Sequence, residues 1–198
     1  MKALKEINAE KVIKFAIFGI FQILYHLLID HIFNIPQARK IFLQLLGVTI
    51  DKDSILMHVQ FFNWHHKGPK GLKIGKDCFI GDETLIDLYD NVVLEDQVTI
   101  AQRVTILTHI NVGYKDHPLQ KYFPKEVKGV IFKEGCVIGA ASTILPGITV
   151  GRQSFVAAGS VVTKNVPEKT LVAGVPAKII RKISGASQRV SKASQRVK

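Results

Sequence analysis

The chain has 198 residues, 47% of them hydrophobic, and a formal net charge of +11 at pH 7. This length suits one ordinary domain with a buried core, and the apolar content excludes a disordered protein. The charge does not indicate a nucleic-acid partner, because much of the excess falls at the C-terminal end, on Lys178, Arg181, Lys182, Arg189, Lys192, Arg196 and Lys198. That basic end is either simply solvated or contacts an anionic lipid or a phosphorylated ligand.

Residues 1–47 are expected to form apolar helices. The run Phe15–Ile29 would make a helix of roughly 22 Å, shorter than the ~30 Å hydrocarbon core, so a transmembrane span is not expected. Asn8 is a candidate N-cap, and a second helix should begin at Pro36 and end before Gly47. Its apolar face would consist of Ile41, Phe42, Leu45 and Leu46. These helices either pack on the body or a neighbouring subunit, or make peripheral membrane contact through residues 12–33.

A period of six residues dominates residues 48–168. Branched or bulky apolar residues begin successive hexads at Ile74, Ile80, Ile86, Leu94, Ile100, Ile106, Phe132, Ile138, Ile144, Val150, Val156 and Val162, with a weaker upstream coil at Ile50, Leu56 and Phe62. Each hexad supplies a short strand and a tight turn, and three hexads close one triangular coil, which predicts a mainly β chain folded as a parallel β-helix.

Alternation along each strand places a second residue inward, two positions before each apolar one. These positions hold small or branched side chains: Cys78, Thr84, Val98, Val104, Cys136, Ser142, Ser154 and Ser160. Both cysteines are therefore predicted to fill the core rather than to react. With no signal peptide and cleavage site in the sequence, a cytoplasmic location is expected. Gly75, Gly81, Gly139 and Gly151 follow apolar hexad residues, where the chain turns a corner.

The chain leaves the repeat near Pro167. Residues 169–184 are predicted to form a strand and a short C-terminal helix that begins at Pro176, and residues 185–198, which contain ASQRV twice, a basic disordered tail.

The longest break in the repeat, residues 107–130, is predicted to be a protruding loop and the place of the chemistry. It contains His109, at the end of a regular hexad, and His117. A histidine there could accept a proton near neutral pH. His65 and His66 suggest a metal site only weakly, because neighbours on a strand point to opposite faces and no further ligand stands at a suitable spacing. No metal is expected.

The stretch from Ile74 to Ile183 resembles the hexapeptide-repeat acyltransferases, which include maltose, galactoside and serine acetyltransferases and polysaccharide O-acetyltransferases. The resemblance is carried by TILPGITVG, AAGSVVTKNVP and AGVPAKIIRKI. It implies a left-handed β-helix, a homotrimer, and acetyl-CoA bound in a cleft between subunits. It also implies a histidine base where the loop begins, in a T-H or H-P-L context. Here T-H occurs at Thr108-His109 and H-P-L begins at His117, so His109 is the first candidate and His117 the second.

The family's coenzyme contacts correspond to Ala140, Ala158, Thr163, Lys164, Lys178 and Arg181. Main-chain groups near the two alanines would bind the pantetheine arm, and the basic residues would face the phosphates. The implied reaction is direct acetyl transfer from acetyl-CoA, with a sugar or saccharide hydroxyl as the first choice of acceptor, as in polysaccharide biosynthesis, close to the inner face of a membrane. N-acetylation of an amino sugar or nucleotide-sugar, a zinc enzyme on the same solenoid, and a non-catalytic trimeric scaffold on a membrane remain alternatives.

Overall fold

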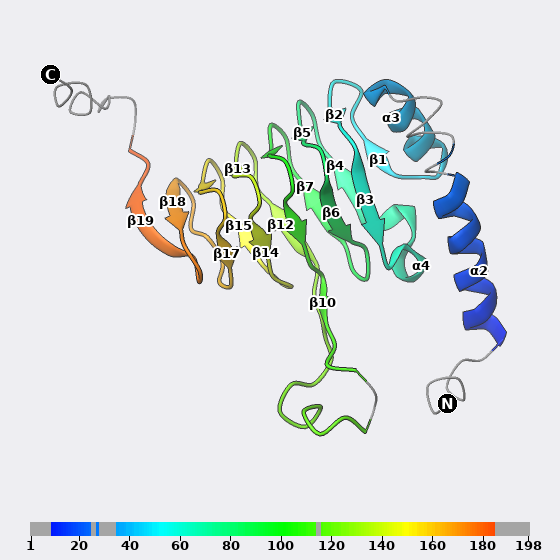
Figure 1. Cartoon of the computed structure of the whole chain (residues 1–198). Coiled ribbons are helices and arrows are strands. Elements are labelled where there is room, and N and C mark those ends of the chain that lie inside the picture. The colour runs from blue at the N-terminus through cyan, green and yellow to red at the C-terminus, as the bar shows by residue number, and fades with distance from the viewer. Residues whose placement is uncertain (1–8, 25–26, 28–34, 114–115, 185–198) are drawn as a thin grey trace, which may run out of the picture.

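The computed structural model describes residues 9–24, 27, 35–113 and 116–184. Figure 1 shows a solenoid of short parallel strands, with helices at its N-terminal end and a long hairpin extending from its middle. The predicted mainly β chain and parallel β-helix are thus confirmed. Asn8 and the tail 185–198 lie outside the described residues.

Three sheets form the faces of the prism, built from parallel strands one coil apart except for the last strand of the second sheet, which is antiparallel. The first contains β1 (Thr49–Ile50), β4 (Leu72–Ile74), β7 (Val92–Leu94), β12 (Val130–Phe132) and β15 (Thr149–Val150). The second contains β2 (Ile55–Leu56), β5 (Phe79–Ile80), β8 (Thr99–Ile100), β13 (Val137–Ile138), β16 (Phe155–Val156), β18 (Thr170–Ala173) and β19 (Lys178–Lys182). The third contains β3 (Val59–Phe62), β6 (Thr84–Asp87), β9 (Thr105–Ile106), β14 (Thr143–Ile144) and β17 (Val161–Val162).

The core follows the predicted hexads. Every apolar hexad residue from Ile74 to Val162 is buried, and so are all eight small or branched inward residues, including Cys78 and Cys136. Burial raises the pKa of the Cys136 thiol to about 12 and also raises that of Cys78, which agrees with a core-filling role.

One residue of the upstream coil is placed incorrectly by the hexad pattern. Ile50 and Leu56 pair with Ile74 and Ile80 as expected, but Phe61 rather than Phe62 pairs with Ile86. The step from Leu56 is one residue shorter than a hexad, so Phe61 points inward and Phe62 is only half-buried.

The glycines after the hexad residues are required by close approach between coils. A Cβ on Gly139 would lie 2.4 Å from the backbone nitrogen of Ala158, and one on Gly151 would lie 2.5 Å from that of Glu168. The turns themselves use another position, three residues after the apolar one, where Asp77, Glu83 and their counterparts in the later coils adopt positive φ.

The N-terminal helices cover one end of the solenoid. α2 spans Ala9–Leu24, and α3 spans Pro36–Leu45 and thus ends before Gly47 as expected. Leu43 is fully buried, whereas Ile41 and Leu45 of the predicted apolar face are exposed and only Phe42 and Leu46 pack on the core. Instead, the half of α3 facing the coil holds Arg39, which is buried and donates to the carbonyl of Leu56 at 3.3 Å.

The predicted short C-terminal helix is wrong. Residues Lys178–Lys182 form β19, which turns back at Gly174 (φ +99°) and pairs antiparallel with β18. A helix of a few residues is marginal in water, whereas the edge of β18 offers backbone hydrogen-bond partners to a segment that contains β-branched residues such as Ile179 and Ile180.

Candidate active site

His109 stands where the hairpin leaves the solenoid. β10 (His109–Ile110) begins three residues after β9 ends, and it pairs antiparallel with β11 (Glu126–Val127). The two strands form the base of the long arm in Figure 1. His109 therefore has the rigid coil on one side and the arm on the other, and its side chain is 22% exposed.

Asp87 holds the His109 ring in place. Its side chain is fully buried at the end of β6, and its Oδ2 lies 2.5 Å from Nδ1 of His109. The other donors around the carboxylate are the Thr108 N–H on Oδ2 at 2.9 Å, and Asn63 Nδ2 and the Tyr89 N–H on Oδ1 at 2.8 and 3.1 Å. Every contact is therefore with a donor, as an ionised carboxylate requires.

The same contacts set the charge of Asp87. Burial acts to raise its pKa, but the hydrogen bonds from His109, Asn63 and the Thr108 N–H outweigh burial, so the pKa lies below its ordinary value. An ionised Asp87 accepts the Nδ1 proton of His109, which fixes the tautomer by its hydrogen bond and leaves the Nε2 lone pair available. Among the described residues, none is hydrogen-bonded to Nε2. The arrangement is that of a general base oriented by a carboxylate.

An aromatic row extends from His109. The Tyr89 ring is stacked on the His109 ring, with centroids 4.6 Å apart, and the His66 ring is stacked on Tyr89 at 3.5 Å. Lys125, from the returning side of the arm, lies over the Tyr89 ring at 4.2 Å and donates to its hydroxyl group.

The pKa of His66 is lowered to about 4. Partial burial against its neighbours lowers the pKa most, and the positive charges of His65, Lys125 and His109 lower it further, against an opposing effect of Asp87. The ring, which still reaches solvent, is therefore neutral at pH 7. His65 and His66 lie on the one-turn helix α4 (Trp64–Lys67) and not on a strand, and their rings are 4.2 Å apart.

His117 lies farther along the arm, eight residues after His109. Its Nδ1 accepts the N–H of Leu119 at 3.2 Å, a local contact within the turn. Of the two predicted bases, only His109 has the surroundings of one.

The predicted coenzyme residues gather mainly at the C-terminal end of the solenoid. Thr163, Lys164 and Lys178 line a groove of about 360 Å³ between the end of β17 and the start of β19. Ala140 and Ala158 lie one coil apart, joined through the Gly159 N–H, which donates to the Ala140 carbonyl at 2.8 Å. Arg181 lies farther along β19, outside the groove lining, and its guanidinium donates to the Lys182 carbonyl at 3.3 Å.

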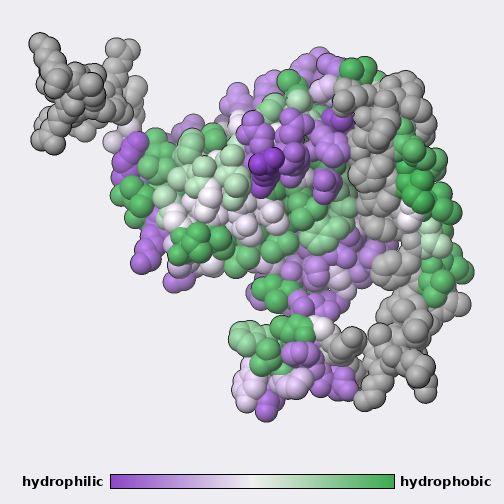
Figure 2. Space-filling model, in the orientation of Figure 1, coloured by the Kyte–Doolittle hydropathy of each residue, from purple (hydrophilic) through white to green (hydrophobic). Residues whose placement is uncertain are grey.

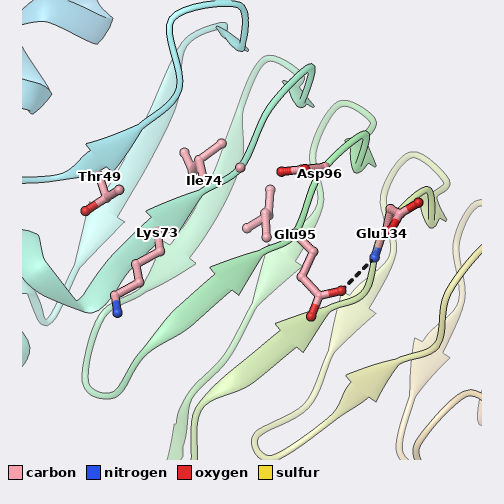
Figure 3. Close-up of a pocket in the computed structure, with 8 residues that line it drawn as sticks. Thr49, Lys73, Ile74, Glu95, Asp96 and Glu134 are labelled. Atoms are coloured by element: carbon pink, nitrogen blue, oxygen red, sulfur yellow. Dashed lines mark hydrogen bonds between the residues drawn. The ribbon is translucent and has the colours of Figure 1, made fainter.

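A second hollow, of about 410 Å³, lies on the first sheet and is drawn in Figure 3. Its lining includes Lys73, Glu95 and Glu134 but neither His109 nor any of its partners. Glu95 is already occupied by Lys133 at 2.7 Å and by the Glu134 N–H at 3.1 Å. This hollow is therefore a charged surface that does not include the His109 site. Within the described ranges, no three His, Cys, Asp or Glu side chains are placed to hold a metal ion.

The sequence did not identify Asp87, Tyr89 or His66 as parts of the site. The sequence did contain a signal for Asp87 and Tyr89. The step from Ile86 to Leu94 is two residues longer than a hexad, and both residues fall at its start. An irregular step next to the coil that carries the base is where a partner should have been sought.

Comparison with known proteins supports the repeat and the fold. The sequence model described as the hexapeptide repeat of succinyl-transferase matches residues 71–102 and 133–164. A serine acetyltransferase of Buchnera aphidicola is 38% identical over 107 residues, which are 54% of this chain and 37% of that protein. The chain thus matches well under half the length of that curated relative.

Solved structures match over more of the chain. A galactoside acetyltransferase in complex with coenzyme A has a TM-score of 0.63 at 27% identity, over 74% of this chain and 70% of that one. A hexapeptide-repeat acetyltransferase of Vibrio cholerae, complexed with acetyl coenzyme A, has a TM-score of 0.73 over 90% of this chain and 91% of that one. At 23% identity the second likeness shows the fold alone.

Proposed function

We propose that this hexapeptide-repeat protein is an acetyltransferase that moves the acetyl group of acetyl-CoA to a hydroxyl group, with His109 as general base. The observation that carries the proposal is the Asp87–His109 pair, in which a buried carboxylate orients an imidazole whose Nε2 is open. The names of similar proteins, a serine acetyltransferase and a galactoside acetyltransferase in complex with coenzyme A, support this reaction.

In the proposed reaction, Nε2 of His109 takes the proton of the acceptor hydroxyl as its oxygen attacks the thioester carbonyl carbon. The carbon–sulfur bond then breaks, and the imidazolium returns the proton to the departing thiolate of coenzyme A. Asp87 stabilises the imidazolium between these steps, and a backbone N–H stabilises the oxyanion. Direct transfer needs both substrates bound together and no covalent enzyme intermediate.

Acetyl-CoA is the proposed donor, and the groove beside β19 is its proposed site. Lys164 and Lys178 line that groove with exposed ammonium groups that suit the coenzyme phosphates. The backbone N–H groups of Ala140 and Ala158 donate to no acceptor within the described part of the chain, which suits them to the carbonyl groups of the pantetheine arm. Arg181 is the weakest member of this proposed set because it lies outside the groove lining.

The acceptor we propose is a sugar or saccharide hydroxyl, as in polysaccharide biosynthesis, with transfer to an amino group as the alternative. Maltose and galactoside acetyltransferases share the fold, and the galactoside enzyme is the more similar in sequence. Both acceptor classes could meet the open Nε2 of His109.

We also propose a homotrimer in the cytoplasm, with peripheral contact to the inner face of a membrane. Apolar residues exposed on the sheets, such as Ile131 and Phe155, suit burial against neighbouring subunits. Figure 2 shows hydrophobic side chains along α2, where Ile13, Ile17 and Ile20 are each more than half exposed. Among the described helices, none is long and apolar enough to cross a bilayer.

The test compares the wild type with His109→Ala and His117→Ala in a thiol-release assay over a panel of sugars and amines. We expect His109→Ala to lower kcat by about 10²–10⁴-fold with acetyl-CoA affinity, measured by calorimetry, little changed. His117→Ala should change kcat by less than a few fold. A larger loss of kcat in His117→Ala than in His109→Ala would assign the role of base to His117. Failure of the wild-type protein to bind acetyl-CoA would overturn the proposed function itself.

A further inference from the structure

We propose that His66, Tyr89 and Lys125 form the acceptor subsite beside His109, and that this subsite selects an acceptor with a carboxylate or phosphate near the reacting hydroxyl group. The inference rests on the proposed function, because it takes His109 as the base. It adds a requirement for an anionic group on the acceptor, which the repeat does not specify.

The first support is the continuity of the aromatic row. The stacked rings place His66 one ring beyond Tyr89, which itself lies against the proposed base. Lys125 reaches the same tyrosine from the arm and contacts both its ring and its hydroxyl group. Donors from three separate segments, α4, the step after β6 and the arm, therefore converge within two rings of the Nε2 that takes the proton.

The second support is the charge balance around the row. Asp87 is fully buried and occupied by its four donors, and Asp90 pairs with Lys67 at 3.3 Å. Within the described chain, no carboxylate lies within ion-pair distance of Lys125, whose contacts are those with Tyr89. An anionic group of a ligand would supply the missing partner of this ammonium.

The third support concerns which surfaces the rings offer. The rings of His66 and His109 lie nearly parallel to that of Tyr89, at interplanar angles of 22° and 25°, so the faces of the tyrosine are occupied. A neutral sugar that binds by stacking needs a free ring face. The Lys125 ammonium and the single ring N–H of the exposed, neutral His66 can instead donate hydrogen bonds to an anion.

The state of His66 agrees with this role. Its pKa of about 4 reflects partial burial and the positive charges of His65, Lys125 and His109, with Asp87 opposing them. A bound anion would offset those positive charges and favour the protonated imidazole.

The test uses three probes of similar size: glucose, glucuronic acid and glucose 6-phosphate. The imidazole signals of the ¹⁵N-labelled full chain are followed by NMR during titration with each, and His66→Asn identifies the signal of interest. We expect the His66 signals to shift with at least one anionic probe and not with glucose. Whichever anion gives the larger shift at equal concentration distinguishes a carboxylate from a phosphate acceptor.

The matched variants are Lys125→Met and Lys121→Met. Both lysines lie on the arm with the ammonium over a tyrosine ring, Lys121 at 4.7 Å from Tyr122, so both variants remove one positive charge and one cation–π contact, and Lys125→Met also removes the hydrogen bond to Tyr89. We expect Lys125→Met to weaken binding of the preferred anion about tenfold, and Lys121→Met to leave it within a factor of two.

Equal shifts with glucose and the anions, or equal losses in the two variants, would overturn the inference. These outcomes are separate from failure of the proposed function, because the titration needs neither acetyl-CoA nor turnover. If acetyl-CoA does not bind but His66 responds to an anion through Lys125, the subsite stands and the transferase assignment falls.

Discussion

Two carboxylates in successive coils illustrate how an irregular step in the repeat differs from the regular sheets. We call the step from Ile86 to Leu94, which is two residues longer than a hexad, the break, and the regular sheet faces the wall. Asp87, at the break, is fully buried and accepts hydrogen bonds from four donors, one of them the proposed base. Glu95, on the first sheet, pairs with Lys133 at 2.7 Å, and the two side chains are 36% and 42% exposed. Both carboxylates have a lowered pKa. For Asp87, burial is the largest single influence and several hydrogen bonds together outweigh it, whereas for Glu95 the hydrogen bond from Lys133 is the largest influence.

This difference shows where the fold concentrates its chemistry. On the wall, ion pairs such as Lys133–Glu95 and Arg152–Glu134 face water, and each is worth little. At the break, the extra residues after Ile86 give room for a buried carboxylate, and the arm brings a cation to the same place. The regular sheets thus provide a rigid support, and the irregular step provides the polar groups of the site. The following substitutions test this difference.

The largest effect is expected from Asp87→Asn. An amide places an NH₂ group among donors only, so His109 is driven to the tautomer with its proton on Nε2, which cannot act as a base. We expect kcat to fall by about 10³-fold, within the range by which general-base catalysis accelerates reactions. The thiol-release assay measures it.

The matched control for Asp87→Asn is Glu95→Gln, which removes one carboxylate charge from the wall. It should leave kcat within a factor of two. Circular dichroism and acetyl-CoA affinity verify that Asp87→Asn remains folded. Turnover of a folded Asp87→Asn protein within a few fold of the wild type would show that the carboxylate does not orient the base.

The next effect tests the wall itself through two glycines. Gly139→Ala would place a Cβ 2.4 Å from the backbone nitrogen of Ala158, where only the coils themselves can move. We expect a loss of about 3 kcal/mol in the free energy of unfolding, as for overpacking of a rigid core. The measurement is denaturant unfolding at one fixed protein concentration.

Gly159→Ala serves as the control because its Cβ meets no atom within 4 Å, although φ is +69°. Only the backbone conformation is strained, and the expected cost is about 1 kcal/mol. Equal losses in the two variants would mean that close approach between coils does not explain the glycine after each hexad residue.

A smaller effect is expected from Lys178→Met compared with Lys182→Met. Both lysines lie on β19 and are exposed, but only Lys178 lines the groove assigned to acetyl-CoA. Loss of one charge-assisted contact to a phosphate should weaken acetyl-CoA binding about tenfold, whereas Lys182→Met should change the dissociation constant by less than twofold. Calorimetry distinguishes them, and equal effects would indicate a diffuse attraction to the basic C-terminal end.

The sequence predicted what depends on local periodicity and left open what depends on contacts between coils. The inward hexad residues from Ile74 to Val162 and the interruption at residues 107–130 follow from spacing alone, and both are confirmed. Asp87 precedes His109 by 22 residues, and only the stacking of β6 on β9 brings them together. The strand β19 was mistaken for a helix for a similar reason, since its conformation is decided by the free edge of β18 rather than by its own residues.

The smallest effect is expected from Glu95→Gln on stability, and pH distinguishes it from Asp87→Asn. Each carboxylate has a folded-state pKa below its ordinary value, so its contribution to stability is present above that value and lost as the pH falls through the folded-state pKa. The hydrogen bond from Lys133 is the main cause of the lowered pKa of Glu95. Because this pair is exposed to water, its contribution to stability is less than about 1 kcal/mol. At pH 7, Glu95→Gln should therefore unfold almost as the wild type does.

Asp87→Asn should be less stable than the wild type at pH 7. On acidification below pH 4 it should lose less stability than the wild type, because the group that titrates there has been removed. If both variants followed the wild-type acid profile in parallel, the buried pair at the break would contribute no more to stability than an exposed pair on the wall.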